Sequence, residues 1–242
     1  MKSAIQLKDI CFNAQGKRIL RNINLTIREG EFVTILGSNG AGKTSLLKII
    51  LGFNKFSRGE IFIFNQKLNS RNIFQIRKKI AYMPQSFDVD RYFPILVRDV
   101  INIGRTGIKG VFKKLDDTDK KIINSVVNEL KITHLLDKPF GVLSGGEKQK
   151  VMLAMVLVQN PQILLLDEPN LNLDLYSYKN FLNLVERIYI KHNLTIIFVT
   201  HLITHIPSHT NKIVVLKNGN IIFKGTNERI FSKKDYLSFI YD

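Results

Sequence analysis

The chain carries, between residues 37 and 45, the stretch Gly37-Ser38-Asn39-Gly40-Ala41-Gly42-Lys43-Thr44-Ser45. Residues 37–44 fit the phosphate-loop pattern G-x-x-x-x-G-K-[ST]. The apolar run 31–37 is typical of a buried strand, and residues 42–51 have apolar side chains at helical spacing. Glycines let backbone N–H groups converge on phosphate oxygens, and the helix start adds the positive end of its dipole. The stretch therefore predicts a nucleotide site in which Lys43 contacts the β- and γ-phosphates, Thr44 ligates Mg²⁺, and the other loop residues with Ser45 contact the nucleotide.

A second stretch, Ile163-Leu164-Leu165-Leu166-Asp167-Glu168, is an apolar strand that ends in two carboxylates. Asp167 at the strand end is placed to hold Mg²⁺ through water, and Glu168 to act as general base for the water that attacks the γ-phosphate. An acidic pair after a strand is, in many proteins, only the start of a helix. Beside a phosphate loop, it predicts a catalytic pair.

A third stretch, Leu143-Ser144-Gly145-Gly146-Glu147, opens a predicted helix over 147–159. Ser144 with Glu147 three residues later fits a capping box, which is a sufficient structural reason for both residues. The two glycines, however, leave backbone N–H groups bare at a helix start, and such a start binds anions. Because the chain already has a complete phosphate loop, the simplest use of this second anion site is to close over a nucleotide held by another subunit.

The composition of the 242-residue chain excludes several classes of protein. There are 36 Lys and Arg against 20 Asp and Glu, which gives a net charge of +16, and 45% of the residues are hydrophobic. No apolar run reaches about 18 residues, so we do not expect a membrane-spanning protein. Residues 1–9 lack the apolar segment of a secretory signal, and Cys11 is the single cysteine, so we do not expect a disulfide-rich secreted protein. The positive charge fits a solvated Lys-rich surface, an anionic membrane surface or nucleic acid, and alone decides nothing.

Hydrophobic periodicity predicts alternating strands and helices, and therefore an α/β fold with a parallel core. We expect half-exposed antiparallel strands at 5–12 and 22–28, and further strands at 31–37, 80–83, 163–166, 195–200, 212–217 and 220–224. We expect helices at 42–51, 97–103, 119–131, 147–159 and 175–190. The helical middle of the chain, about 88–160, is interpreted as an inserted subdomain.

With these motifs in place, the chain resembles the nucleotide-binding domains of ABC (ATP-binding cassette) transporters over essentially its whole length. Residues 143–147 match the LSGGE signature of that family, Gln85 its Q-loop glutamine, Asp174 its D-loop aspartate and His201 its switch histidine. The resemblance implies a single ABC ATPase domain with a P-loop NTPase (RecA-like) core over about 1–87 and 161–242. It also implies an antiparallel β subdomain and the inserted α-helical subdomain.

The same resemblance implies roles and partners. Gln85 would reach Mg²⁺ and the attacking water, and His201 would bind the γ-phosphate. Two copies would form a head-to-tail homodimer around two ATP molecules, each held between one copy's phosphate loop and the partner copy's Ser144 to Glu147. Asp174 would also belong to the nucleotide site. Hydrolysis would drive integral membrane permease subunits, with this chain peripheral at the cytoplasmic face of the inner (plasma) membrane.

A narrower resemblance lies in the run from Phe87 to Phe112, which looks like the ATPase subunits of zinc and manganese importers. Ferric-chelate (ferric-siderophore or haem) importers are the next most similar. A substrate-binding protein outside the membrane would then deliver the metal to the permease. The alternatives are an exporter subunit, which the run disfavours, and a soluble ABC ATPase acting on nucleic acid. The latter class usually carries two cassettes, and no nucleic acid is expected here.

Three features depart from the family pattern or invite another interpretation. Ala14 occupies the position where the family usually stacks an aromatic ring on adenine, which predicts weaker or less adenine-selective binding unless Phe12 or another residue substitutes. Asn170 replaces a common threonine, with a modest effect expected. His201, His205 and His209 recur at the spacing of metal ligands on a helix, but Pro207 would disturb that helix, so we expect no metal there.

Overall fold

Two β-sheets form the frame of the protein in a computed structural model that describes residues 2–85, 90, 93–110, 112–169 and 174–226. The first sheet is antiparallel with the order β2-β1-β4-β5. Its strands are β1 (Ser3–Ala14), β2 (Lys17–Arg28), β4 (Arg58–Ile63) and β5 (Gln66–Lys67). On β2, buried and exposed residues alternate towards its C-terminal end, as expected for a sheet with one face on the core.

The second sheet has six strands in the order β10-β9-β3-β8-β7-β6, and neighbouring strands from β9 to β6 run parallel. The strands are β3 (Phe32–Leu36), β6 (Ile80–Met83), β7 (Ile163–Asp167), β8 (Thr195–Thr200), β9 (Lys212–Lys217) and β10 (Asn220–Gly225). All residues of β3, β7 and β8 are buried. Strands covered on both faces explain the continuous apolar runs in the sequence.

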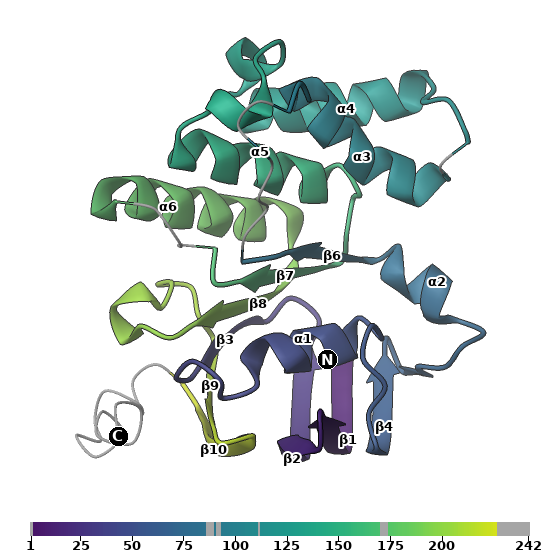
Figure 1. Cartoon of the computed structure of the whole chain (residues 1–242), viewed down its shortest axis with the longest axis vertical. Coiled ribbons are helices and arrows are strands. Elements are labelled where there is room, and N and C mark those ends of the chain that lie inside the picture. Colours follow the sequence, from purple (N-terminus) through teal and green to yellow (C-terminus); the bar gives the residue numbers. More distant parts are fainter. Residues whose placement is uncertain (1, 86–89, 91–92, 111, 170–173, 227–242) are drawn as a thin grey trace.

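Each face of the six-stranded sheet belongs to a separate hydrophobic cluster. Val33, Ile35 and Leu165 pack with α1 (Lys43–Ile50) and with the four-stranded sheet. Phe32 and Leu164, one residue out of phase, pack on the other face with α3 (Val97–Lys109), α5 (Gly145–Leu157) and α6 (Leu175–His192). Figure 1 shows α1 beside the four-stranded sheet, with α3, α5 and α6 on the opposite side of the central strands. The phosphate loop and the signature stretch therefore begin helices in different layers.

The helices α3, α4 (Asp117–Glu129) and α5 lie together at the end of the molecule far from the four-stranded sheet (Figure 1). Gly104 of α3 lies so close to α5 that a Cβ there would come within 1.8 Å of the Met155 carbonyl oxygen. An ion cluster joins α3 to α4, because Arg105 Nε contacts Asp119 at 2.7 Å and Lys109 pairs with Asp116 and Asp119. Close backbone contact and paired charges hold these helices to one another.

The predicted α/β fold class is confirmed, and the predicted strands and helices are present with end shifts of a few residues. The strands β4 and β5 and the short helix α2 (Ile73–Arg77) were not expected from the sequence, and α3 continues to Lys109, beyond the predicted end at residue 103. The boundaries of the helical subdomain near residues 88 and 160 stay a prediction. Within the described ranges, none of the helices is both long and apolar enough to cross a membrane.

Candidate functional site

The loop between β3 and α1 holds its backbone in a conformation that only small residues allow. Gly42, the residue before α1, has φ +104°, and a Cβ at Gly37 would lie 2.3 Å from the Leu216 carbonyl oxygen. Side chains larger than hydrogen would therefore strain or displace the loop. No side chain caps α1 at Gly42, and residues Ser38, Asn39 and Gly40 are exposed. The loop thus presents backbone to solvent at the positive end of a helix dipole.

Lys43 is buried, with 5% of its side chain exposed, and lies folded over the loop that precedes it. Its Nζ donates hydrogen bonds to the carbonyl oxygens of Gly37 and Ser38, both at 2.9 Å. The same ammonium group lies 2.9 Å from Glu168 Oε1. A buried charge needs such partners, since an unpaired ammonium group would be strongly destabilising there.

Glu168 lies at the centre of three of the predicted site residues. Its Oε2 atom is 2.9 Å from His201 Nδ1 and accepts a hydrogen bond of 3.4 Å from Gln85 Nε2. Glu168 itself is a non-glycine residue at φ +44°, which is a strained backbone conformation for such a residue. The structure therefore brings Lys43, Gln85 and His201 together around one buried carboxylate.

Asp167, the neighbour of Glu168, is completely buried at the end of β7. Thr44 Oγ1 donates a hydrogen bond to its Oδ1 at 3.1 Å, and the Tyr82 hydroxyl donates to its Oδ2 at 3.0 Å. Burial raises the pKa of Asp167, and the charge of Glu168 adds to this effect, whereas the two hydrogen bonds oppose it. Carboxylate and hydroxyl oxygens within hydrogen-bond distance are the kind of donors that Mg²⁺ prefers.

Tyr82 was not among the residues singled out in the sequence. Burial, followed by the charge of Asp167, raises the pKa of Tyr82, so the hydroxyl stays protonated and donates. The alignment of β6 with β7, in which Tyr82 pairs with Leu165, brings the phenol to the same face as Asp167 two residues later. The sequence does show a tyrosine hydroxyl in the strand before Gln85, which could have indicated a role for Tyr82. It does not show, however, which strands are neighbours in the sheet.

Ser144 and Glu147 form the predicted capping box at the start of α5. Glu147 Oε2 accepts from the Ser144 backbone N–H at 2.9 Å and from Ser144 Oγ at 2.8 Å, and these bonds lower the pKa of Glu147. Asp174 caps α6 with its own side chain, whose Oδ1 accepts from the Ser177 N–H at 2.8 Å. These residues, with Gly145 and Gly146, belong to the helical layer and not to the phosphate loop of their own chain. The helices that these residues begin, α5 and α6, pack on the opposite face of the six-stranded sheet from α1, the helix that follows the phosphate loop.

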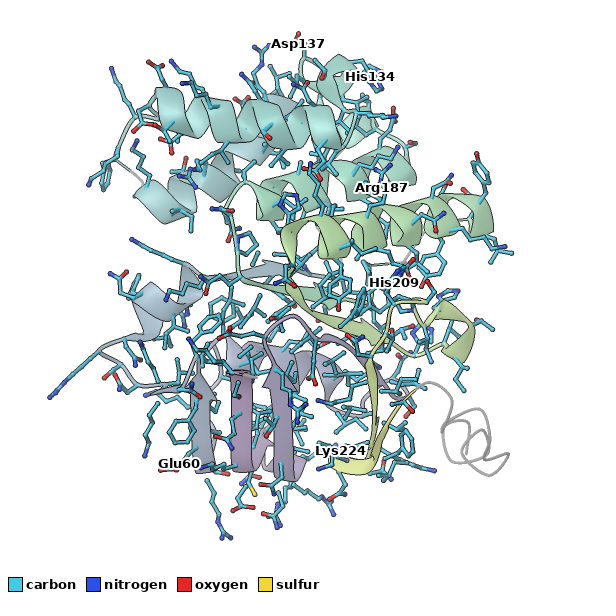
Figure 2. The ribbon with its side chains drawn as sticks, turned by 180° about the vertical axis from the view of Figure 1, so that it is seen from behind. Glu60, His134, Asp137, Arg187, His209 and Lys224 are labelled. Carbon is cyan, nitrogen blue, oxygen red and sulfur yellow. The ribbon has the colours of Figure 1, made fainter. Side chains whose placement is uncertain are left out.

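The remaining sequence features lie as follows. Phe12 is packed into the cluster beneath the four-stranded sheet with only 9% exposed, so its ring offers no free face near Ala14. His205 stacks on Tyr178, with ring centroids 4.1 Å apart, and His209 pairs with Glu186. Figure 2 shows His209 on the flank of the molecule beneath α6. Asn170 and most of the run from Phe87 to Tyr92 lie outside the described residues.

Comparison with known proteins gives consistent matches. A family model described as ABC transporter matches residues 20–171. The zinc uptake system ATP-binding protein ZurA of Listeria monocytogenes is 32% identical over 227 residues, which is 93% of this chain and 87% of ZurA. Among solved structures, cbiO1 from Clostridium perfringens, part of the ABC transporter complex cbiONQ, has a TM-score of 0.84 at 29% identity, covering 99% of this chain and 95% of cbiO1.

A further match is the dimeric structure of the ATP-binding cassette MJ0796 in a post-hydrolysis state, bound to ADP and Pi. It has a TM-score of 0.77 at 28% identity and covers 92% of this chain and 98% of MJ0796. With the phosphate loop, the buried carboxylates and the capped signature helix already in place, these matches show that the chain belongs to the ABC transporter family, as one of its ATP-binding, ATP-hydrolysing subunits.

Proposed function

We propose that the chain energises an importer for a divalent metal ion, zinc or manganese, or for a metal chelate. The observation that carries the ATPase part is the Glu168 carboxylate, held 2.9 Å from both the Lys43 ammonium and the His201 imidazole. The metal part rests on relatives such as ZurA, a zinc uptake system ATP-binding protein. In this proposal the metal is cargo, and this subunit does not bind it.

The triphosphate is expected to lie on the backbone N–H groups of residues 37–45, at the start of α1. Asp167, Thr44 and the amide oxygen of Gln85 would hold Mg²⁺, because all three offer oxygen atoms and the first two are already within 3.1 Å of each other. When bound, Mg²⁺ supplies positive charge that offsets the negative charge of the triphosphate. These residues fit Mg²⁺ because all of their donor atoms are hard oxygen ligands.

Hydrolysis then needs a base that is free to accept a proton. Phosphate oxygens of the bound nucleotide would compete with Glu168 for the ammonium group of Lys43. This competition would release the Glu168 carboxylate to orient water. The water oxygen bonds to the γ-phosphorus as the bond to the β,γ-bridging oxygen breaks, Glu168 accepts the water proton, and ADP leaves with the electron pair. His201 would keep Glu168 in position and contact the γ-phosphate.

A second copy is proposed to complete each nucleotide site in a head-to-tail dimer. The bare backbone N–H groups at Gly145 and Gly146 and the hydroxyl of Ser144 suit an anion, and they lie in another layer from the phosphate loop of the same chain. Asp174, at the start of α6, would lie at the same junction between copies. The dimeric MJ0796 structure with ADP and Pi supports this arrangement.

The membrane partner is proposed to dock in an apolar groove of about 350 Å³ between α2 and α3, here called the docking groove. Its lining includes exposed aromatic side chains, with Phe74 73% exposed and Phe53 57% exposed, and Arg77 and Lys78 are also part of it. An apolar groove beside positive charge suits a short permease helix that has an apolar face and acidic flanks. Such docking would hold the subunit at the cytoplasmic face of the membrane. The substrate-binding protein would act on the other side of the membrane.

Metal uptake in a strain that lacks this chain tests the proposal. Uptake of zinc or manganese should fall in that strain, recover with the wild-type chain and stay low with Lys43→Ala. Ferric-siderophore uptake, measured in parallel, should not change if the cargo is a divalent metal ion. Normal uptake of both divalent metals in the deletion strain would reject the metal assignment, and a selective loss of ferric-siderophore uptake would favour a chelate as cargo.

A further inference from the structure

Tyr82 lies between the docking groove and the buried carboxylate of Asp167. Its side chain is part of the groove lining, together with Phe53 and Ile103, while its hydroxyl donates a 3.0 Å hydrogen bond to Asp167 Oδ2. Tyr82 is only half-buried, whereas Asp167 is fully buried. One side chain therefore reaches from a solvent-accessible groove to the interior of the nucleotide site.

The hydrogen bond fixes the orientation of the Asp167 carboxylate. Tyr82 donates a hydrogen bond to Oδ2, and Thr44 donates one to Oδ1. The two oxygens are therefore held by donors from two different elements, β6 and the start of α1. A hydrogen bond from a hydroxyl to a buried carboxylate is charge-assisted and stronger than one between neutral groups. Without the Tyr82 hydroxyl, only Thr44 of these two donors would hold the carboxylate, through Oδ1, and its orientation would be less restricted.

We propose that Tyr82 is a positioning residue that holds Asp167 for Mg²⁺ and makes its orientation sensitive to what fills the docking groove. This rests on the proposed function in two respects, Asp167 as a Mg²⁺ ligand and the groove as a docking surface. In this role Tyr82 acts through its hydrogen bond to Asp167. A residue that hydrogen-bonds a metal ligand in this way typically changes metal affinity by about tenfold or more when removed.

The first test measures metal binding without catalysis. The full chain is loaded with a non-hydrolysable ATP analogue, and Mn²⁺, as a spectroscopic substitute for Mg²⁺, is titrated by electron paramagnetic resonance. Tyr82→Phe should weaken Mn²⁺ binding by about tenfold, with unchanged affinity for the analogue in the absence of metal. Tyr189→Phe, which removes a hydroxyl bonded to Gly30 and Asn211 instead, is the matched control and should bind Mn²⁺ like the wild type.

The second test fills the docking groove with a larger side chain of the protein itself. Gly107 lines it, and a Cβ there would meet no atom within 4 Å, so Gly107→Trp adds bulk to the groove without a clash at Cβ. If the groove acts through Tyr82, Gly107→Trp should change Mn²⁺ affinity by about threefold or more in the wild type and have no effect in the Tyr82→Phe background. Equal effects in both backgrounds, or no effect in either, would overturn the link to the groove.

Unchanged Mn²⁺ affinity in folded Tyr82→Phe would overturn the positioning role itself. Failure of the proposed function looks different, because then the wild-type chain would show no metal binding that depends on the nucleotide. Thermal unfolding of each variant shows whether it is folded, and the isosteric Phe preserves the ring that lines the groove.

Discussion

Lys43, Asp167 and Glu168 are all buried, although each carries or can carry a charge. Each is retained by a small set of polar partners, and Glu168 in addition adopts a backbone conformation that is unfavourable for a non-glycine residue. Buried, paired charges contribute little to folding compared with apolar side chains of similar size. Their concentration beside one loop therefore reflects the chemistry of the site more than the stability of the fold.

Replacing Glu168 by Gln removes the base while keeping the size of the side chain. We expect ATP hydrolysis to fall by about 10²- to 10⁴-fold, ATP binding to persist, and the protein to accumulate as a closed dimer on size-exclusion chromatography with MgATP. Glu186→Gln, at a carboxylate that instead binds Ser208, is the matched control and should hydrolyse ATP normally. Hydrolysis at the wild-type rate by Glu168→Gln would mean that another group takes the proton.

Ala14 offers a second test at the level of one residue, because Phe12 is packed in the core and does not replace the missing ring. Ala14→Tyr should tighten ATP binding by about fivefold, as expected from about 1 kcal/mol of base stacking. Nucleotide titration with ATP and GTP would measure this, with Ala14→Leu as a control for added apolar bulk. Equal affinities for Ala14→Tyr and the wild type would show that the base does not approach Ala14.

At the scale of helices, α4 and α5 begin with the same capping box. Ser144 and Glu147 cap α5, and Asp116 and Asp119 cap α4. Ser144→Ala should destabilise the protein by about 1 kcal/mol, or a few degrees in the thermal midpoint. Asp116→Ala removes the equivalent cap and also the ion pair with Lys109, so it should lower the midpoint at least as much. Only Ser144→Ala should reduce ATP hydrolysis; an equal reduction by both variants would assign Ser144 a purely structural role.

The ion cluster between α3 and α4 predicts a dependence of stability on pH. Lys109, then Arg105, and the Asp116 backbone N–H hold the pKa of Asp119 well below its ordinary value. The cluster therefore stabilises the fold fully above the ordinary value of about 4 and loses its contribution as the pH falls further. Asp119→Asn should lower the thermal midpoint at pH 7, with a gap to the wild type that narrows below about pH 4.

Thermal melts between pH 7 and about pH 2 would measure that gap, because the lowered pKa keeps Asp119 ionised in the folded protein well below its ordinary value. Asp117→Asn, at an exposed carboxylate that pairs with Lys120 three residues along, should leave the midpoint nearly unchanged at every pH. A gap that stays constant down to the lowest pH would show that the Asp119 charge does not stabilise the fold.

The elements that the sequence predicted are those with strong periodicity or apolar runs, such as β3, β7 and α1. The strand β4 begins Arg58-Gly59-Glu60 and exists because β1 pairs along it, which is a contact between distant parts of the chain. The five-residue α2 has no recognisable period. Similarly, local motifs located Lys43, Asp167 and Glu168, whereas Tyr82 became apparent only once β6 was seen beside β7. Local sequence could not supply these pairings.

At the scale of the whole molecule, the docking groove predicts where the membrane partner binds. Phe74→Glu places a negative charge in the apolar lining and should abolish co-purification with the permease while leaving ATP binding intact. Ile190→Glu makes a comparable change at an exposed apolar residue of α6 and should not affect co-purification. Loss of the permease from both variants, or from neither, would place the contact elsewhere.

The opposite layers of the phosphate loop and the signature helix have a consequence for kinetics. If one polypeptide holds ATP and another must supply the Ser144 turn, hydrolysis by the isolated subunit becomes a second-order process. Specific activity should then rise with enzyme concentration until dimer formation is complete. On dilution, molecules that still carry their nucleotide should stop hydrolysing it. Tethering by the permease would remove this dependence, so that the free subunit consumes little ATP away from its transporter.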